Sequence, residues 1–382
     1  MITMAEWFGL SKGHSDFSLD NDSDREFLFA RAELNDRIMA ILRRTFRTGH
    51  APKFVLYGDW GVGKTHTMRH VEYVLTSESD FSANVVFIEL PDIGKKSTFQ
   101  IAHAALLDAL GLDTAKTWMT QFQARHGADA TREIQELTQS GDIAKAFATL
   151  IGFGEASRIA WDWLRGANLS SAEARSVALP SALSQSHALV QVLRFLGRLS
   201  KEVDGRPLVF LVDEATKLDN VTDADAIHHW VNAMKVISSD DVREFGFIAS
   251  ASYMDQDDMP LALSDQQVVT RFGESSYILL PTFGEDQARQ FVDALLDEIV
   301  DDARRKQITV DHDSETEGEA CGNTYPFTDA AFEELISYLT RLGGITRPRD
   351  IQQTLNDILN RAIDDDRHLL SSAYLARLFA EG

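Results

Sequence analysis

The stretch Gly58–Thr65 constrains this chain most. Its sequence, GDWGVGKT, fits the pattern G-x-x-x-x-G-K-[ST] at every fixed position. Glycines in such a loop let backbone N–H groups close around phosphate oxygens, while the lysine reaches the outer phosphates and the threonine hydroxyl ligates Mg²⁺. A buried strand is predicted at 53–57 and a helix at 65–75, so the anion would face the N-terminus of that helix. A chance glycine-rich turn is the less favoured alternative.

This pattern predicts that the chain binds ATP together with Mg²⁺. The residues expected to contact the nucleotide are Gly58, Asp59, Trp60, Gly61, Val62, Gly63, Lys64, Thr65 and His66. Among them, Lys64 would act on the outer phosphates and Thr65 on the metal.

A second motif lies at 208–214, where the sequence LVFLVDE ends an apolar run with two acids. Four consecutive apolar residues predict a strand that is buried on both faces. Ligands of a doubly wound sheet bind at the carboxyl ends of its strands, where Asp213 and Glu214 would lie. We expect Asp213 to hold Mg²⁺, and Glu214 to orient and deprotonate the attacking water. An Asp-Glu pair says little alone, but after a complete phosphate loop it is informative.

Further strands are predicted at 84–90, 245–250 and 277–281, alternating with helices. The strand predicted at 245–250 comes after the strand at 208–214 and ends in Ser250-Ala-Ser252. Either serine would be a polar group placed to sense a γ-phosphate, or else a helix cap. The alternation predicts an α/β fold with a parallel sheet sandwiched by helices.

Four parts of the chain are expected from these patterns. Residues 1–23 are polar and read as an N-terminal arm, and 24–282 form the α/β domain. Within it, about 111–182 is predicted to be a helical insertion whose Trp118, Trp161 and Trp163 are more typical of core packing than of a ligand cage. A helix is expected from about Ser97, with Ser97 and Gln100 at capping-box spacing. From 283 to 382 the alternation stops, which predicts a separate α-helical unit.

The charge balance argues against a surface coated with positive charge. The net charge is −22, from 37 basic and 59 acidic residues, although this leaves room for a local basic patch. Many acids fall in 297–319, where the spacing fits no EF-hand loop, so a solvated loop is favoured over a cation site. The single cysteine, Cys321, excludes an internal disulfide and a cysteine-based zinc site, and we expect it to be inert.

A cytoplasmic protein with no membrane association is expected. The longest apolar runs are far shorter than a membrane span, and the first residues lack the charged and apolar regions of a signal peptide.

The order of these parts resembles the AAA+ ATPases, especially the clade of origin-recognition and initiator proteins, transposition regulators and helicase loaders. The resemblance covers about residues 25–380, interrupted by the insertion. On it, 58–65 resembles Walker A and 208–214 resembles Walker B, while Ser250 or Ser252 stands at the sensor-1 position, where that family more often has Asn or Thr. The implied fold is a P-loop ATPase domain with a C-terminal helical lid.

Two arginines are carried over from this resemblance. Thr270-Arg271-Phe272 is similar to the Ser-Arg-Phe box whose arginine acts as an arginine finger, and 344–350 (GITRPRD) resembles sensor 2, with Arg349 aligned and Arg347 as its competitor. A guanidinium also suits the charge that develops on a transferring phosphoryl group. Either arginine could instead be an ordinary salt-bridge partner. A finger at Arg271 implies a homo-oligomer with nucleotide at its subunit interfaces.

The partner is left open between two classes. In the initiator and transposition-regulator clade, the loop after the second strand touches the DNA backbone, so the resemblance implies duplex DNA at Lys95 and Lys96; the alternative is a solvated loop. The acidic composition and the tryptophan-bearing insertion instead favour a nucleotide-gated switch or scaffold acting on a protein partner. A small-molecule kinase is disfavoured, because it would need neither the helical lid nor the Thr-Arg-Phe box.

A second, shorter resemblance concerns the insertion. Residues 163–166 (WLRG) and 172–175 (AEAR), ahead of 205–214, are similar to ATP-binding proteins of bacterial phage-defence islands, such as the BREX-associated ones. This resemblance suggests a role in defence.

Overall fold

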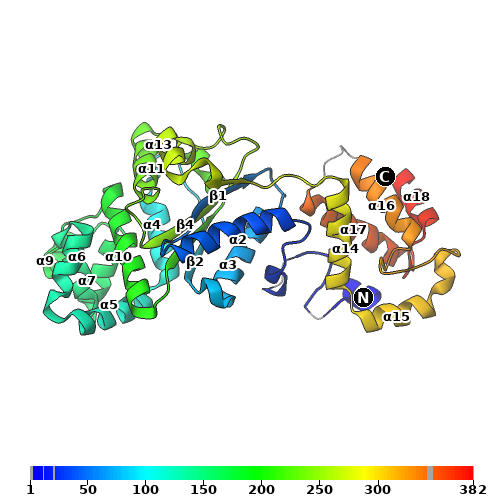
Figure 1. Cartoon of the computed structure of the whole chain (residues 1–382), viewed down its shortest axis with the longest axis horizontal. Coiled ribbons are helices and arrows are strands. Elements are labelled where there is room, and N and C mark those ends of the chain that lie inside the picture. Colours follow the sequence, from blue (N-terminus) through cyan, green and yellow to red (C-terminus); the bar gives the residue numbers. More distant parts are fainter. Residues whose placement is uncertain (1–2, 12, 20–21, 342–346, 382) are drawn as a thin grey trace. The chain divides into compact units, whose positions relative to one another are not determined.

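The chain is divided into two compact units. A computed structural model describes residues 3–11, 13–19, 22–341 and 347–381, and Figure 1 shows their helices and strands. One unit comprises residues 37–58 and 71–279, and the other comprises 1–36, 59–70 and 280–382. This division runs close to the expected boundary at 282/283, but it groups the first 36 residues and the phosphate-loop segment 59–70 with the C-terminal helices.

The first unit is built on the predicted parallel sheet, and the α/β class is confirmed. The five strands pair in the order β2-β3-β4-β1-β5, and every pairing is parallel. Their bounds are β1 Lys53–Gly58, β2 Asn84–Glu89, β3 Leu208–Asp213, β4 Phe245–Ser252 and β5 Tyr277–Leu279. All six residues of β3 are buried, which is why its sequence is a continuous apolar run rather than an alternating one.

Helices cover this sheet and alternate with its strands (Figure 1). They are α2 Ala32–Arg47, α3 Lys64–Ser77, α4 Gln100–Leu110, α10 Ser186–Asp204, α11 Ala224–Ile237, α12 Leu261–Ser264 and α13 Gln266–Phe272. Helix α10 approaches the start of β4 so closely that a Cβ added at Gly197 would lie 2.3 Å from the carbonyl oxygen of Glu244. Glycine is therefore required there by the contact between helix and sheet.

The segment predicted to be a helical insertion contains five helices, gathered together at one side of this unit (Figure 1). They are α5 Leu112–His126, α6 Ala130–Thr138, α7 Gly141–Leu150, α8 Glu155–Leu164 and α9 Ser171–Val177. Trp118, Trp161 and Trp163 are all buried in the hydrophobic core that this segment shares with the sheet. The indole nitrogen of Trp118 donates a hydrogen bond to Asp204, at the end of α10. These tryptophans are packing residues.

The capping box predicted at Ser97 is wrong. Helix α4 begins at Gln100, and no side chain caps it. The Ser97 hydroxyl instead accepts a hydrogen bond from the Gly94 N–H at 2.9 Å, and the Gln100 amide donates to the carbonyl oxygen of Gly166. The Ser97 and Gln100 side chains both bond to loop residues, and their three-residue spacing in the sequence could not reveal these contacts.

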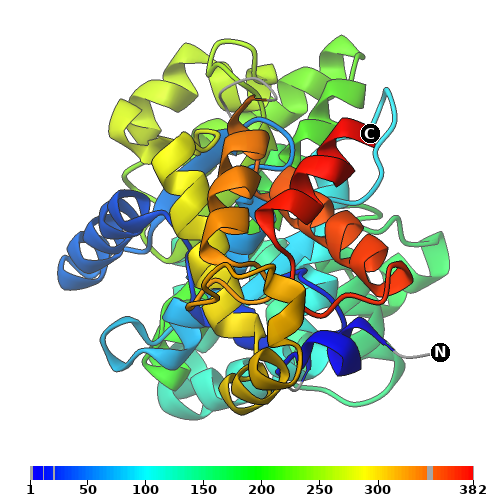
Figure 2. The same ribbon diagram turned by 90° about the vertical axis from the view of Figure 1, so that its right-hand side faces the viewer.

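The second unit contains a helical bundle with its own hydrophobic core (Figure 2). Its longer helices are α14 Glu285–Ile299, α15 Asp302–Asp311, α16 Asp329–Arg341, α17 Pro348–Asp364 and α18 Ser372–Glu381. Within the described part of the chain, no helix has the length and apolar character that crossing a membrane requires.

Two expectations about this unit differ from the structure. The N-terminal residues are not a free arm: α1 (Met4–Phe8) is packed, and Met4, Phe8, Leu10 and Phe17 are all buried in the helical core. The acidic segment is not a loop throughout, because α15 occupies much of it and the 3-10 turn η6 (Asp313–Thr316) follows. Cys321 is half-buried, and burial raises the pKa of its thiol, which agrees with an inert side chain.

Candidate nucleotide site

The phosphate loop follows β1 and leads directly into α3, as the motif predicts. Gly61 and Gly63 have φ angles of +80° and +93°, a backbone region that side-chain-bearing residues rarely adopt. The ammonium group of Lys64 is buried and donates a hydrogen bond to the Asp59 carbonyl oxygen at 2.7 Å, so it lies over its own loop. Thr65, in the first turn of α3, is exposed.

Both candidate sensor-2 arginines contact this loop. The Arg347 guanidinium lies 2.5 Å from the Asp59 carboxylate. The Arg349 guanidinium stacks over the Trp60 ring at 4.1 Å, and its backbone N–H donates to the Gly61 carbonyl oxygen at 3.3 Å. The structure thus brings both arginines to the loop rather than choosing between them. Residues 344–346 of the same motif lie outside the described residues.

The loop is also held by Arg31, which sequence reasoning missed. Its buried guanidinium donates to the carbonyl oxygens of Val62 and Pro281, at 2.8 and 2.9 Å. Burial lowers the pKa of Arg31 to about 10, which still leaves it charged at neutral pH. Arg31 lies 31 residues before Val62 and belongs to no motif, so the sequence gives no sign of this contact.

His66, which was expected to contact the nucleotide, instead contacts the backbone at Phe27 in the same unit. Its Nε2 atom lies 2.7 Å from the carbonyl oxygen of Phe27, and burial lowers the pKa of the imidazole. The ring is therefore neutral at pH 7 and anchors the backbone near Phe27.

In the sheet unit, Asp213 and Ser250 meet at the ends of β3 and β4. The Asp213 carboxylate is buried and accepts hydrogen bonds from the Ser250 hydroxyl and from the Glu214 N–H, the latter at 2.9 Å. Ser252, the other serine considered, uses its backbone N–H to bond the Thr216 hydroxyl at 2.6 Å. Ser250 is therefore the serine whose hydroxyl is directed at the acidic pair.

Glu214 is exposed and paired with a lysine that the sequence did not single out. Its backbone is left-handed (φ +58°), and its carboxylate lies 2.8 Å from the Lys217 ammonium. The same ammonium bonds Glu89, at the end of β2, at 2.7 Å. Hydrogen bonds to Glu214 and Glu89 raise the pKa of Lys217, and the bond to Lys217 lowers the pKa of Glu89. The available signal was a lysine three residues after Glu214, in the turn that follows β3.

The sheet topology relates these groups to the start of the phosphate loop. Gly58 ends β1 opposite Ser252 of β4, and Glu89 ends β2 opposite Asp213 of β3. Because all the strands are parallel, their carboxyl ends share one edge of the sheet. The phosphate loop leaves β1 from the edge that carries Asp213, Glu214 and Ser250.

The remaining predicted residues lie outside this group of contacts. Arg271 is exposed in the last turn of α13 and donates to the Lys235 carbonyl oxygen at 2.5 Å. Lys95 and Lys96 are exposed in the loop between β2 and α4, which is fixed by hydrogen bonds from the Thr222 and Asp223 N–H groups to the Lys95 carbonyl oxygen.

The profile of a family described as "AAA ATPase domain" matches residues 28–226, more than half of the chain. No curated protein matches the sequence. The structure is similar to that of the Aeropyrum pernix ORC2 protein in its ADPNP–ADP complexes, with a TM-score of 0.51 and 15% identity over 98% of this chain and 73% of that chain.

Two further solved structures show weaker similarity. For Cdc6p from Pyrobaculum aerophilum, the TM-score is 0.46, with 12% identity over 96% of this chain and 67% of that chain. For the A. pernix ORC1 protein in complex with DNA, the TM-score is 0.45, with 14% identity over 93% of this chain and 66% of that chain. The match to the ORC2 protein shows a shared fold, and these comparisons do not support the resemblance to phage-defence proteins.

Proposed function

The chain belongs to the AAA ATPase domain family, and on that premise we propose that it binds ATP with Mg²⁺ and hydrolyses the terminal phosphoanhydride bond. The observation that carries this proposal is the shared sheet edge. A complete phosphate loop leaves β1 at Gly58, the buried Asp213 ends β3, and the exposed Glu214 follows it. Loop, metal ligand and base are the parts that hydrolysis of a nucleoside triphosphate requires.

The donor set suits Mg²⁺, which prefers hard oxygen ligands. The Thr65 hydroxyl and the Asp213 carboxylate would hold the ion, and the ion would neutralise charge on the phosphates. Lys64 would exchange its bond to the Asp59 carbonyl for the outer phosphates, and Ser250 would keep the Asp213 carboxylate oriented. Arg349, with Arg347 beside it, would bring the C-terminal helices to the nucleotide, since both already contact the loop.

The proposed base is tested by separating ATP binding from turnover. Glu214→Gln removes the basic carboxylate but keeps its size, so we expect ATP binding to persist while hydrolysis falls by roughly 10²-fold or more. Lys64→Ala should lose binding itself, because the ammonium that reaches the phosphates is gone. The measurements are binding of a fluorescent ATP analogue and the rate of phosphate release. Undiminished hydrolysis in Glu214→Gln would rule out this carboxylate as the base.

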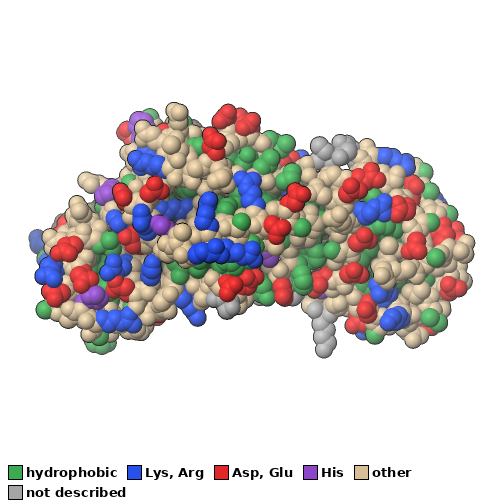
Figure 3. Space-filling model, viewed as in Figure 1, with side chains coloured by type: hydrophobic (Ala, Val, Ile, Leu, Met, Phe, Trp, Pro, Cys, Tyr) green, Lys and Arg blue, Asp and Glu red, His purple; other side chains and the backbone are tan. Residues whose placement is uncertain are grey.

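We further propose that the ATPase acts as a homo-oligomer on duplex DNA. The net charge of −22 disfavours binding to nucleic acid, but basic side chains are grouped at two places on the chain. Arg43, Arg44 and Arg47 are exposed near the end of α2, where Figure 3 shows a run of basic side chains, and Lys95 and Lys96 are exposed in their loop. Such clusters favour contact with a phosphate backbone without reading its sequence.

The DNA proposal is tested by the rate of ATP hydrolysis with and without duplex DNA, at low and moderate salt. DNA should stimulate hydrolysis, the stimulation should fade as salt rises, and replacing both Lys95 and Lys96 by Ala should weaken it. Hydrolysis that does not respond to DNA at any salt concentration would instead favour a switch that acts on a protein partner.

One observation favours that second function. An apolar pocket of about 140 Å³ is lined by Leu218, Trp230 and the exposed Leu261, beside the turn that follows Glu214.

A further inference from the structure

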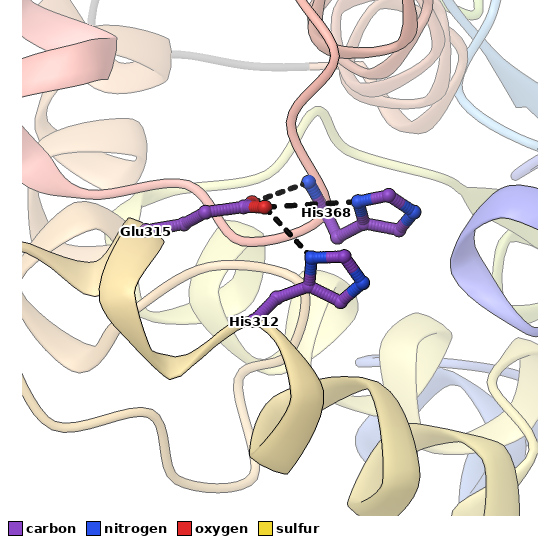
Figure 4. A group of neighbouring side chains, drawn as sticks. All are labelled: His312, Glu315 and His368. Carbon is purple, nitrogen blue, oxygen red and sulfur yellow. Dashed lines mark hydrogen bonds and ion pairs between the residues drawn. The ribbon is translucent and has the colours of Figure 1, made fainter.

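Three side chains from two distant parts of the sequence converge in the helical unit. His312 follows α15, Glu315 lies in η6, and His368 precedes α18 (Figure 4). Both imidazoles turn their Nδ1 atoms toward one carboxylate oxygen, Oε1 of Glu315, at 2.8 Å for His312 and 3.7 Å for His368. One potential ligand atom from each residue lies within 4.8 Å of the other two.

Hydrogen bonding within the protein does not satisfy all of these atoms. Nδ1 of His312 lies at hydrogen-bond distance from Oε1 of Glu315, but Nδ1 of His368 is too far from that oxygen for a hydrogen bond. Nδ1 of His368 is buried and has no hydrogen-bond partner among the described residues. Buried polar atoms in folded proteins nearly always have a partner. A further group between the three ligand atoms would supply one.

The surroundings hold the three side chains in place. The second oxygen of Glu315 accepts the backbone N–H groups of His368 and Leu369, at 2.6 and 2.9 Å, which leaves Oε1 directed at the imidazoles. The His368 ring stacks against His312 at 3.7 Å and against Trp7 of α1 at 4.0 Å between ring centroids. The Trp7 indole N–H in turn donates to the Arg367 carbonyl oxygen at 2.8 Å. Hydrogen bonds that orient a ligating carboxylate, as the two backbone N–H groups orient Glu315, are a feature of metal sites.

We propose that His312, Glu315 and His368 form a zinc site, with Nδ1 of each histidine and Oε1 of the glutamate as ligands. Two imidazoles and one carboxylate are a ligand set that zinc accepts, with water in the fourth position. Tetrahedral ligands at zinc distances lie roughly 3.3–3.4 Å apart, and the two Nδ1–Oε1 separations are 2.8 and 3.7 Å. Because the two imidazole rings are stacked with 19° between their planes, at least one ring must rotate before both Nδ1 lone pairs meet one ion. Binding displaces the proton shared by His312 and Glu315 to solvent.

Zinc at this position would link Glu315 of η6 to His368, 53 residues later in the segment before α18. It would also fix the His368 ring, on which Trp7 packs. Closing a long loop through a metal stabilises the folded chain. This inference does not depend on the proposed ATPase, because none of the three residues belongs to the nucleotide site.

The test is the zinc content of the nucleotide-free full-length chain after incubation with Zn²⁺ and desalting. We expect about one zinc ion per wild-type chain, and none in His312→Ala or His368→Ala. His126→Ala is the matched control, because His126 also lies between two carboxylates, Glu133 at 2.8 Å and Glu202 at 3.0 Å. Within the described part of the chain, these three residues do not form a group that could hold a metal. That variant should keep the metal, as should Asp213→Asn, which removes the proposed Mg²⁺ ligand.

A second measurement guards against variants that fail to fold. Zn²⁺ should raise the melting temperature of the wild-type protein at pH 7.5, and the rise should shrink as the pH falls, because protons compete with the metal for its ligands. The variants His312→Gln and His368→Gln, whose circular dichroism would report their folding, should melt at the same temperature with and without zinc. A wild-type chain that holds no zinc overturns the proposal. So does equal zinc content or an equal shift in melting temperature in the histidine variants.

Discussion

At the scale of single residues, Lys217 is placed to restrain the proposed base. Its ammonium holds the Glu214 carboxylate at 2.8 Å and Glu89 at 2.7 Å, so it competes with water for the oxygen that would accept the proton. Lys217→Met removes the charge and keeps the apolar stem. We expect ATP hydrolysis to rise by roughly 2- to 10-fold, a small part of what a positioned base contributes. The control is Lys235→Met, which breaks another lysine ion pair, to Asp265, in the same unit. A lower rate would mean that Lys217 positions Glu214 for catalysis instead.

At the scale of elements, α1 tests whether the N-terminal residues are part of the helical core. Phe8 is fully buried there, and the C-cap Gly9 accepts the Asp301 N–H at 2.9 Å. Phe8→Ala should lower the free energy of unfolding of this unit by about 3–5 kcal/mol, through lost burial and the cavity left behind. The matched control is Phe153→Ala in the other unit, where the ring is 91% exposed and the loss should stay within about 1 kcal/mol. Urea unfolding followed by circular dichroism measures both, and equal losses would contradict the packed position of α1.

At the scale of the whole molecule, the proposed oligomer can be tested by mixing inactive chains. Arg271 is exposed at the end of α13, and in the proposed oligomer it would act on a neighbouring subunit's nucleotide. Arg271→Ala should bind ATP but hydrolyse it roughly 10³-fold more slowly, if this arginine acts as a finger. Lys64→Ala should be inactive for lack of bound nucleotide. Mixing the two should restore hydrolysis, because one variant supplies the intact phosphate loop and the other the arginine. Full activity of Arg271→Ala alone, or no recovery on mixing, would count against a site completed by a neighbouring subunit.

The amino-acid sequence by itself determined the sheet and the core of the candidate site. The buried run of β3, the glycines before Lys64 and the acids at 213 and 214 are local patterns, and each follows from backbone conformation or burial over a few residues. The family match confirms the resemblance to AAA ATPases that these patterns indicated. Helix α17, Pro348–Asp364, was also predictable, because proline at its first position and its apolar periodicity are local signals.

Only the tertiary structure decided which distant residues meet. Trp7 and Arg367 are 360 residues apart, and Arg31 reaches Pro281 across 250. The packed N-terminal helix, the pairing of Lys217 with Glu89 and the convergence of His312 with His368 have the same origin. Periodicity specifies which face of an element is buried, but the partner of that face is chosen by the packing of the whole unit. For this reason the phosphate loop could be recognised from eight consecutive residues, whereas Arg31 beside the loop, Lys217 beside the proposed base and the histidines of the proposed zinc site could be found only in the folded chain.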